Sequence, residues 1–388
     1  MSKIRIIKAS SLYPAYLASF VAAHPGMEPL TSTERAGVLG QDFFAGAGVW
    51  KDALEALGDF EVWEIALNAG FVQQAWAAER KIPYGAESWV QDIFLAQCRE
   101  YRPDVLFALG FDVLTPDFLR RIKQDLPGLR VVSYEGIALA APRRFSATDL
   151  MLSCAEFILE PYRAAGLRCA LLPHGFDRRI LACIEQRPAR YPATFIGSLV
   201  LGPNNHQARL RWLDQVARAC PVELFLQMDS TARLAASRLK QALKERAAAP
   251  LRAAREEVPA VYRLNLGNHG GVFGLRMFQA LSDSGLTLNR HIDAAGNHAA
   301  NMRLFEATGA GVCLLTDWKP NLGEIFEIDR EVIAYRSTEE CVDKLRFLLA
   351  HPAECQAVGR AGQQRTLRDY DSRRATQQLA PLLRDLAA

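Results

Sequence analysis

The chain has 388 residues, of which 50% are hydrophobic and 23% are charged. This length exceeds one ordinary hydrophobic core and predicts two domains of roughly 150 to 200 residues, while the composition excludes a disordered or membrane-embedded chain. Forty-six basic residues against 43 acidic ones leave a formal charge of +3, which is too small to indicate nucleic-acid binding by itself.

Short apolar runs alternate with helical patterns through the first half of the sequence. The opening segment, MSKIRIIK, predicts a β-strand because its apolar run is too short for a signal peptide. No later segment reaches the roughly 20 apolar residues that a membrane span needs, so we expect a cytoplasmic protein. Alternation of this kind is typical of βαβ units in a doubly wound parallel sheet. The predicted strands of this half are residues 3–8, 61–65, 104–110, 130–135, 149–153 and 168–173.

A second alternating set follows residues 185–193, whose prolines and charged residues indicate an interdomain linker. We therefore expect one domain over residues 1–185, a second over 186–370, and a C-terminal helix over 371–388. The predicted fold class is α/β, with two Rossmann-like domains that each contain a doubly wound parallel sheet. The predicted strands of the second half are residues 193–198, 222–227, 286–290, 312–317 and 331–335.

Several ligand-binding motifs are missing from the sequence. The first strand runs into ASSLYP without the G-x-G-x-x-G of a dinucleotide fold, which disfavours NAD or FAD. The P-loop, zinc-protease and serine-hydrolase motifs are absent as well. Asp369 and Asp371 form a D-x-D pair, but their place between two predicted helices indicates a helix cap rather than a metal site. We therefore expect no metal and no other cofactor.

Four segments together resemble a known group of enzymes. Residues 298–327, HAANMRLFEATGAGVCLLTDWKPNLGEIFE, predict a helix that ends in Glu-Ala-x-x-x-Gly, then a strand, then a turn that includes glutamate. LPHGFD at 172–177, FIGSL at 195–199 and SDSGLTLNRH at 282–291 fit around this segment. In combination, the four segments resemble family 4 and CgeB-like GT-B glycosyltransferases, whose C-terminal domain is of the glycosyl transferases group 1 type.

The resemblance implies the GT-B fold, in which two Rossmann-like domains face a central cleft that holds a nucleotide-sugar. It implies that the first domain lies on the acceptor side and that the second binds the donor. It also implies that the C-terminal helix crosses back to the first domain. The similarity covers mainly residues 168–388, and the first 165 residues match only as a fold.

The segment that carries the resemblance predicts a phosphate site and a ribose site. We expect a helix to begin near Ala299 or Ala300. His298 and Asn301 then lie in its first turn, where free backbone N–H groups favour phosphate. Glu306 follows about two turns after His298 on the same helix face, where its carboxylate can accept ribose hydroxyl protons. In the resembled family two glutamates stand seven residues apart, and here His298 occupies the position of the first, which contacts the transferred sugar.

Other polar residues follow predicted strands or begin predicted helices. Arg290 ends a predicted strand and could bind phosphate, whereas Arg303 could bind phosphate or pair with Glu306. Gly197 and Ser198 end another strand, where glycine lets a ligand approach the backbone closely. A turn before a short helix could bind the sugar or the diphosphate through its amides. The predicted donor-binding residues are Gly197, Ser198, Asn289, Arg290, Asn301, Arg303, Glu306, Lys319, Asn321 and Leu322.

The predicted catalytic residues are Asp112, Glu135 and His298. Asp112 and Glu135 each follow a predicted strand of the first half, where a carboxylate could act as the general base for an acceptor hydroxyl. A turn-forming or capping role is the alternative for both.

Residues 233–255 contain seven lysines and arginines on a helical, alanine-rich pattern. A basic helix of this kind could rest on an anionic membrane surface. A solvated helix face is the alternative interpretation.

The sequence thus predicts a glycosyltransferase that moves a hexose-like sugar from a UDP- or GDP-sugar to a hydroxyl of a glycan, a lipid-linked saccharide or a protein. We expect this reaction in the assembly of bacterial surface polysaccharide or glycoconjugate, with no nucleic-acid partner. Two alternatives stay open: a nucleotide-sugar epimerase of the same fold, and a non-catalytic protein that binds a nucleotide-sugar.

Overall fold

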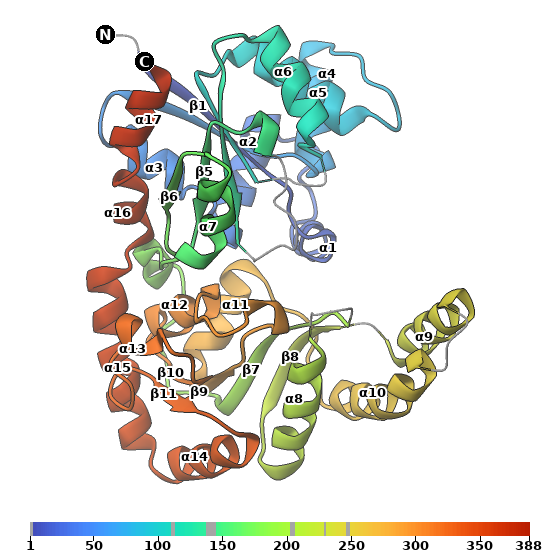
Figure 1. The fold of residues 1–388 in the computed structure, drawn as a ribbon, viewed down its shortest axis with the longest axis vertical. Helices are drawn as coiled ribbons and strands as arrows, with labels where there is room; N and C mark the ends of the chain where they lie inside the picture. The colour runs from blue at the N-terminus through green and yellow to red at the C-terminus, as the bar shows by residue number, and fades with distance from the viewer. Residues whose placement is uncertain (1–2, 110–112, 137–144, 202–205, 229, 246–248) are drawn as a thin grey trace. The chain divides into compact units, whose positions relative to one another are not determined.

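The computed structural model describes all residues except 1–2, 110–112, 137–144, 202–205, 229 and 246–248. Backbone contacts divide the chain into two compact units. Unit 1 comprises Met1–Asp177 together with Asp371–Ala388, and unit 2 comprises Arg178–Tyr370. Figure 1 shows the helices and strands of each unit.

Unit 1 contains a six-stranded parallel sheet with the strand order β2-β1-β3-β4-β5-β6. Its strands are short apolar runs, and β3 and β5 are buried at every position, as expected for a parallel sheet that is covered on both faces. Because β1 pairs with both β2 and β3, the order of the strands reverses at β1. The strands are β1 (Ile4–Ser10), β2 (Phe60–Ala66), β3 (Val105–Ala108), β4 (Arg130–Glu135), β5 (Leu150–Ser153) and β6 (Cys169–Leu171).

Helices cover both faces of the unit 1 sheet. On one face, Phe94 of α5 and Leu119 of α6 join one apolar core. On the other, Trp50 of α3 stacks on Phe107 of β3 at 4.1 Å, and Leu383 of α17 joins the same core. The helices are α1 (Pro14–Ala23), α2 (Ser32–Gly40), α3 (Val49–Glu55), α4 (Gly70–Arg80), α5 (Trp89–Tyr101), α6 (Pro116–Asp125), α7 (Glu156–Ala164), α16 (Ser372–Gln377) and α17 (Ala380–Ala387), with 3₁₀ turns at Phe44–Gly46 and Phe145–Ala147.

Unit 2 contains a five-stranded parallel sheet with the order β11-β10-β9-β7-β8. The leucines of β9, Leu286 and Leu288, face a core that α8, α10 and α14 complete. In that core, Trp212 of α8 stacks on Tyr335 at the end of β11, with ring centroids 5.7 Å apart. The strands are β7 (Tyr191–Leu199), β8 (Glu223–Met228), β9 (Ser284–Asn289), β10 (Cys313–Asp317) and β11 (Ile333–Tyr335).

The helices of unit 2 alternate with the strands except in two places: α9, α10 and α11 follow β8 in succession, and α14 and α15 both follow β11 (Figure 1). In the described part of the chain, none of the helices combines the length and the apolar character that crossing a bilayer requires. The helices are α8 (Gln207–Ala219), α9 (Thr231–Glu245), α10 (Ala249–Leu266), α11 (Gly274–Ser282), α12 (Met302–Gly309), α13 (Leu322–Ile325), α14 (Thr338–Ala350) and α15 (Pro352–Asp369), with 3₁₀ turns at Arg178–Ala182 and Asp293–Ala295.

The predicted α/β fold with two Rossmann-like, doubly wound parallel sheets is confirmed. Each predicted strand is present, with ends that differ by a few residues. One difference concerns the predicted site, because β7 does not end at Gly197 and Ser198. It continues to Leu199, and all three residues pair with β8.

Two glycines let α15 pack closely against its neighbours. A Cβ atom at Gly359 would lie 2.5 Å from the carbonyl oxygen of Gly311, and one at Gly362 would lie 2.5 Å from that of Glu331. These distances are shorter than any ordinary contact between a carbon and an oxygen atom. A side chain at either position would therefore push α15 away from the turn before β10 or from the segment before β11.

The same substitution should have opposite effects at two helical glycines. Gly359→Ala should lower the free energy of unfolding by about 1–3 kcal/mol, because the clash outweighs the gain in helix propensity. Gly37→Ala in α2 should raise it by up to about 1 kcal/mol, because a Cβ atom there meets nothing within 4 Å. Urea unfolding followed by circular dichroism measures both values, and equal effects of the two substitutions would contradict the packing of α15.

Candidate functional site

The strand order of unit 2 reverses between β7 and β9. These strands pair from Tyr191 and Ser284 up to Phe195 and Leu288, and beyond that point β7 continues to Leu199 without β9 beside it. In open α/β sheets, ligands bind at the carboxyl ends of the strands, at the point where the strand order reverses. A ligand site is therefore expected at the carboxyl ends of β7, β9 and β10.

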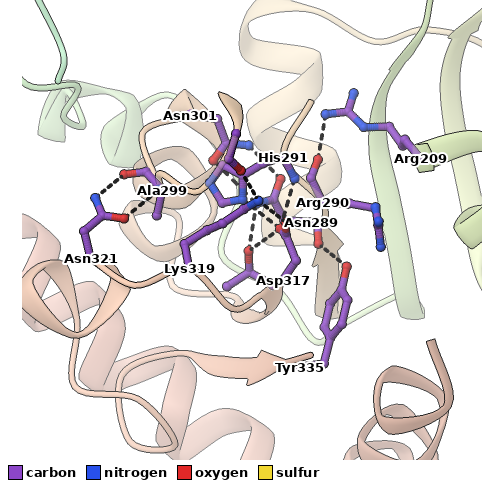
Figure 2. A network of polar contacts seen from close by, with 12 residues as sticks. Arg209, Asn289, Arg290, His291, Ala299, Asn301, Asp317, Lys319, Asn321 and Tyr335 are labelled. Atoms are coloured by element: carbon purple, nitrogen blue, oxygen red, sulfur yellow. Dashed lines mark hydrogen bonds and ion pairs between the residues drawn. The ribbon is translucent and has the colours of Figure 1, made fainter. Parts of the chain in front are cut away.

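A buried arginine side chain lies where the strand order reverses. Arg209 of α8 is 7% exposed, and its guanidinium donates one hydrogen bond to the carbonyl oxygen of Ser198 (3.1 Å) and another to that of Arg290 (2.6 Å). The first carbonyl belongs to β7 and the second follows β9, so one side chain joins the ends of the two strands. Figure 2 shows the contact with Arg290. Burial lowers the pKa of Arg209 to about 10, and the group stays charged near neutral pH.

A buried histidine and aspartate lie at the ends of β9 and β10. The side chain of His291 is fully buried, and its Nδ1 lies 2.7 Å from Oδ1 of Asp317. The backbone N–H of His291 donates to the same oxygen at 2.9 Å. Burial alone would raise the pKa of Asp317, but the hydrogen bonds and charge of His291, together with the charge of Lys319, lower it to about 2. The carboxylate is therefore ionised at physiological pH.

Two asparagines fix the start of α12 to the end of β9. Asn301 donates from its side-chain amide to Oδ1 of Asn289 at 2.8 Å, and Asn289 donates to Oγ1 of Thr316 at 2.9 Å. The backbone carbonyl of Asn289 also accepts a hydrogen bond from the hydroxyl of Tyr335 (2.9 Å). Strands β9, β10 and β11 and the start of α12 thus meet in one network, which Figure 2 shows.

The segment between β10 and α13 holds the loop that precedes α12. The side-chain amide of Asn321 exchanges two hydrogen bonds with the backbone of Ala299, of 2.8 and 3.0 Å. Lys319 donates from Nζ to the carbonyl of Gly296 at 2.6 Å and lies 3.6 Å from Oδ2 of Asp317. The side chains of Lys319 and Asn321 are thereby used to position the loop (Figure 2).

Helix α12 begins later than the sequence analysis predicts. It starts at Met302 with Asn301 at the N-cap, so His298 lies in the preceding loop and does not share a helix face with Glu306. The reason is tertiary, because the backbone N–H and carbonyl of Ala299 are bonded to Asn321 instead of to a helical neighbour, and Asn301 has an extended backbone. No side chain caps α12, and its first backbone N–H groups are therefore not used by an N-cap side chain.

Glu306 and Arg303 form an ion pair on α12. The distance between Arg303 Nη1 and Glu306 Oε2 is 3.0 Å, and the two side chains are 14% and 13% exposed. Arg303 also lies 3.3 Å from the sulfur atom of Met277 in α11. Of the two interpretations given to Arg303, the structure contains the pair with Glu306, and this pair fixes the orientation of the carboxylate.

Three further predicted donor-binding residues have structural roles. The carbonyl of Ser198 is occupied by Arg209. At Gly197 a Cβ atom would come within 3.3 Å of the Phe195 ring. Leu322 is fully buried, and its backbone N–H donates to the carbonyl of Lys319 at 3.0 Å. The side chain of Leu322 is therefore part of the core, and its amide is not free for a ligand.

The carboxylates predicted for the acceptor lie in unit 1. Glu135 is the last residue of β4, as the sequence indicates, but it is only 5% exposed, and the hydroxyl of Tyr162 lies 3.5 Å from its carboxylate. A general base has to reach the acceptor hydroxyl, so this burial argues against that role for Glu135. Asp112 lies outside the described residues.

The D-x-D pair, Asp369 and Asp371, lies at the junction between α15 and α16. Asp371 accepts hydrogen bonds from the backbone N–H groups of Arg373 and Arg374 at the start of α16, and Asp369 pairs with Arg365 at 3.1 Å. The predicted capping role is thereby confirmed. Across the described ranges of the chain, no group of three His, Cys, Asp or Glu residues could hold a metal ion.

Sequence reasoning missed Arg209 and Asp317. A signal existed for the arginine, because Arg209 shares the buried face of α8 with Trp212, Leu213 and Val216, and a charged residue on such a face needs a buried partner. Asp317 ends an apolar strand in the same way as Asn289 does. Its partner, His291, is distant in sequence and could be identified only from the sheet order.

Comparison with known proteins gives two kinds of similarity. Residues 229–380 match the model of a glycosyl transferase-like family, and this segment contains β9, α12 and β10. No match is found among curated protein sequences.

The whole chain is similar in fold to solved GT-B glycosyltransferases. Sucrose-phosphate synthase from Thermosynechococcus elongatus has a TM-score of 0.57 at 13% identity, over 99% of each chain. HepE from Anabaena, solved in complex with UDP-glucose, has a TM-score of 0.56 at 13% identity, over 98% of this chain and 100% of that one. The UDP-forming α,α-trehalose-phosphate synthase from Burkholderia vietnamiensis has a TM-score of 0.57 at 9% identity, over 100% and 98%. The chain therefore has the GT-B fold.

Asp317→Asn should remove an acid-dependent part of the stability. Since the folded-state pKa lies near 2, below the ordinary value of 3.8, the ionised group stabilises the fold above about pH 4, and this contribution is lost as the pH falls towards 2. The variant should lose roughly 2 kcal/mol at pH 7, and its difference from the parent should shrink with acidification. Urea unfolding at pH 7, 5, 4 and 3 measures this.

Asp343→Asn is the matched control, because the side chain of Asp343 is 78% exposed in the same unit. This control should follow the parent at every pH. A difference between Asp317→Asn and the parent that stays constant from pH 7 to pH 3 would contradict the ionised, hydrogen-bonded state of Asp317.

Proposed function

We propose that this chain is a glycosyltransferase that moves a sugar from a nucleoside-diphosphate sugar to a hydroxyl acceptor. The observation that carries the proposal is the start of α12, which no side chain caps and which the Asn289–Asn301 contact holds at the carboxyl end of β9. The glycosyl transferase-like match over residues 229–380 supports glycosyl transfer, because it includes this helix. The GT-B fold agrees with it.

The diphosphate of the donor would bind at the start of α12. Backbone N–H groups there point out of the helix, and the helix dipole places partial positive charge at the same end. The guanidinium of Arg290 lies 5.8 Å from the centroid of the Trp212 ring and points away from Asn301 (Figure 2). The N–H groups and the helix dipole would stabilise the negative charge that the departing nucleotide gains as the glycosidic bond breaks. We therefore propose that the reaction needs no bound metal.

The ribose would bind to Glu306. A carboxylate accepts hydrogen bonds from two neighbouring hydroxyl groups, and the pair with Arg303 holds this carboxylate in one orientation. HepE was solved in complex with UDP-glucose, so a UDP-sugar is the first choice of donor for this chain, and a GDP-sugar is the second.

In the transfer step, the bond between the anomeric carbon and the diphosphate oxygen breaks, and the acceptor oxygen bonds to that carbon. The hydroxyl proton of the acceptor passes to a base. We assign His298 to the transferred sugar, because it lies in the loop just before α12, where the resembled family has its first glutamate.

We further propose that the chain is related to the family 4 and CgeB-like enzymes. The similarity of residues 298–327 to their C-terminal signature supports this. Its acceptor would be a glycan, a lipid-linked saccharide or a protein, in the cytoplasmic assembly of surface polysaccharide or glycoconjugate.

Glu306→Ala should abolish the thermal stabilisation that a matching nucleoside diphosphate gives, because the ribose hydroxyls lose their acceptor. Glu306→Gln should keep a reduced stabilisation, since its amide retains one acceptor oxygen. Glu324→Ala is the control, because Glu324 is an exposed glutamate in the same unit. The shift in melting temperature with UDP, GDP, CDP and TDP measures the effect, and an unchanged shift in Glu306→Ala would contradict the ribose role.

Incubation with the sugar derivatives of the stabilising nucleotide tests the reaction itself. We expect slow hydrolysis of the donor, or glycosylation of an added acceptor, with release of the nucleoside diphosphate. Loss of this turnover in Glu306→Ala, with turnover kept in Glu324→Ala, would assign it to the proposed site. An epimerised donor, or stabilisation without any turnover, would overturn the proposal in favour of an epimerase or a binding protein.

A further inference from the structure

Helices α9 and α10 form a pair that uses one side of each helix for internal packing. Arg238 of α9 and Glu257 of α10 form a buried ion pair of 2.7 Å. Leu234, Ala260 and Val261 are buried in the core of unit 2. The remaining sides of both helices are turned outward (Figure 1).

The outward sides carry large apolar side chains in helical register. Leu239 and Leu243, one turn apart on α9, are 52% and 73% exposed. On α10, Tyr262 and Leu266 are also one turn apart and are 56% and 72% exposed, and Leu251, three turns before Tyr262, is 43% exposed. Scattered exposed leucines are common on protein surfaces. Aligned stripes on two adjacent helices instead indicate a surface that a membrane or another molecule covers.

Basic side chains flank the apolar stripe of α9. Lys240 and Lys244 are exposed and directly follow Leu239 and Leu243, which places them about 100° around the helix. The described residues of the two helices contain seven basic residues against three glutamates: Arg233, Arg238, Lys240, Lys244, Arg252, Arg255 and Arg263 against Glu245, Glu256 and Glu257. Arg238 pairs with Glu257, and Arg263 pairs with Asp214 of α8. The exposed remainder of the two helices therefore carries five basic residues against two glutamates.

We propose that the outward surface of α9 and α10 binds an anionic lipid bilayer. Leucine and tyrosine side chains enter the boundary between headgroups and acyl chains, while adjacent lysines contact anionic headgroups. The positive charge of the surface favours a lipid bilayer over another protein, because a surface that combines exposed leucines with a local excess of cations is complementary to anionic lipid. The surface of a second copy of the chain would bring like charges together. The inference does not depend on the proposed function, since the surface contains none of the donor-site residues.

Co-sedimentation of the full chain with lipid vesicles tests the proposal. The protein should sediment with vesicles that contain phosphatidylglycerol, and at least about tenfold less with pure phosphatidylcholine, because lysine and arginine gain from the negative surface potential. Equal binding to both kinds of vesicle, or to neither, would overturn the proposal.

Two double variants separate the apolar and the charged contributions. Leu239→Ser with Leu243→Ser, and Lys240→Gln with Lys244→Gln, should each lower binding to the anionic vesicles by roughly tenfold or more. All four side chains are exposed, so the melting temperature should stay within a few degrees of the parent. Phe347→Ser and Arg360→Gln, which change exposed residues on α14 and α15, are the matched controls and should bind as the parent does.

Size-exclusion chromatography gives the competing outcome. A parent that elutes as a dimer, with Leu239→Ser and Leu243→Ser converting it to a monomer and without vesicle binding in either form, would assign the surface to a second copy and overturn the lipid proposal. Binding that is lost equally in the control variants would overturn it as well.

Discussion

The candidate site depends on one buried guanidinium. Beyond Phe195 and Leu288, β7 has no partner on the side of β9, so backbone carbonyls at these strand ends need another donor. Arg209 supplies it to the carbonyls of Ser198 and Arg290. A buried charge is tolerated only when such acceptors surround it, and the position of Arg290 is therefore fixed by the same contact that satisfies Arg209.

Most of the side-chain amides around this contact form hydrogen bonds with one another or with nearby backbone groups. Asn301 binds Asn289, and Asn321 binds the backbone of Ala299. Such contacts fix the irregular loop between β9 and α12 to the neighbouring elements. They also divert Asn301 from the capping role that asparagine commonly has at a helix start. The N-cap side chain is thus used for tertiary structure, and the first N–H groups of α12 have no side-chain cap.

The strands could be predicted from the sequence because each is a buried apolar run with polar flanks, a purely local property. The start of α12 could not, because the backbone of Ala299 is held by the side chain of Asn321, which is 22 residues away in the sequence. Glu135 shows the same limit, since its position at the end of β4 is evident from the pattern but its burial against Tyr162 is not. The pairing of His291 with Asp317 likewise requires the sheet order.

Helix α8 connects the two surfaces to which we assign roles. Arg209 near its start holds the strand ends at the site, and Asp214, five residues later, pairs with Arg263 of α10 at 2.7 Å. Asp214 is 8% exposed, and the side chain of Arg263 is 43% exposed. Five residues of helix have a fixed rise and rotation. A bilayer that binds the outward surface of α9 and α10 would therefore set the direction in which the carboxyl ends of β7 and β9 face, and so the side from which a lipid-linked acceptor would approach the donor.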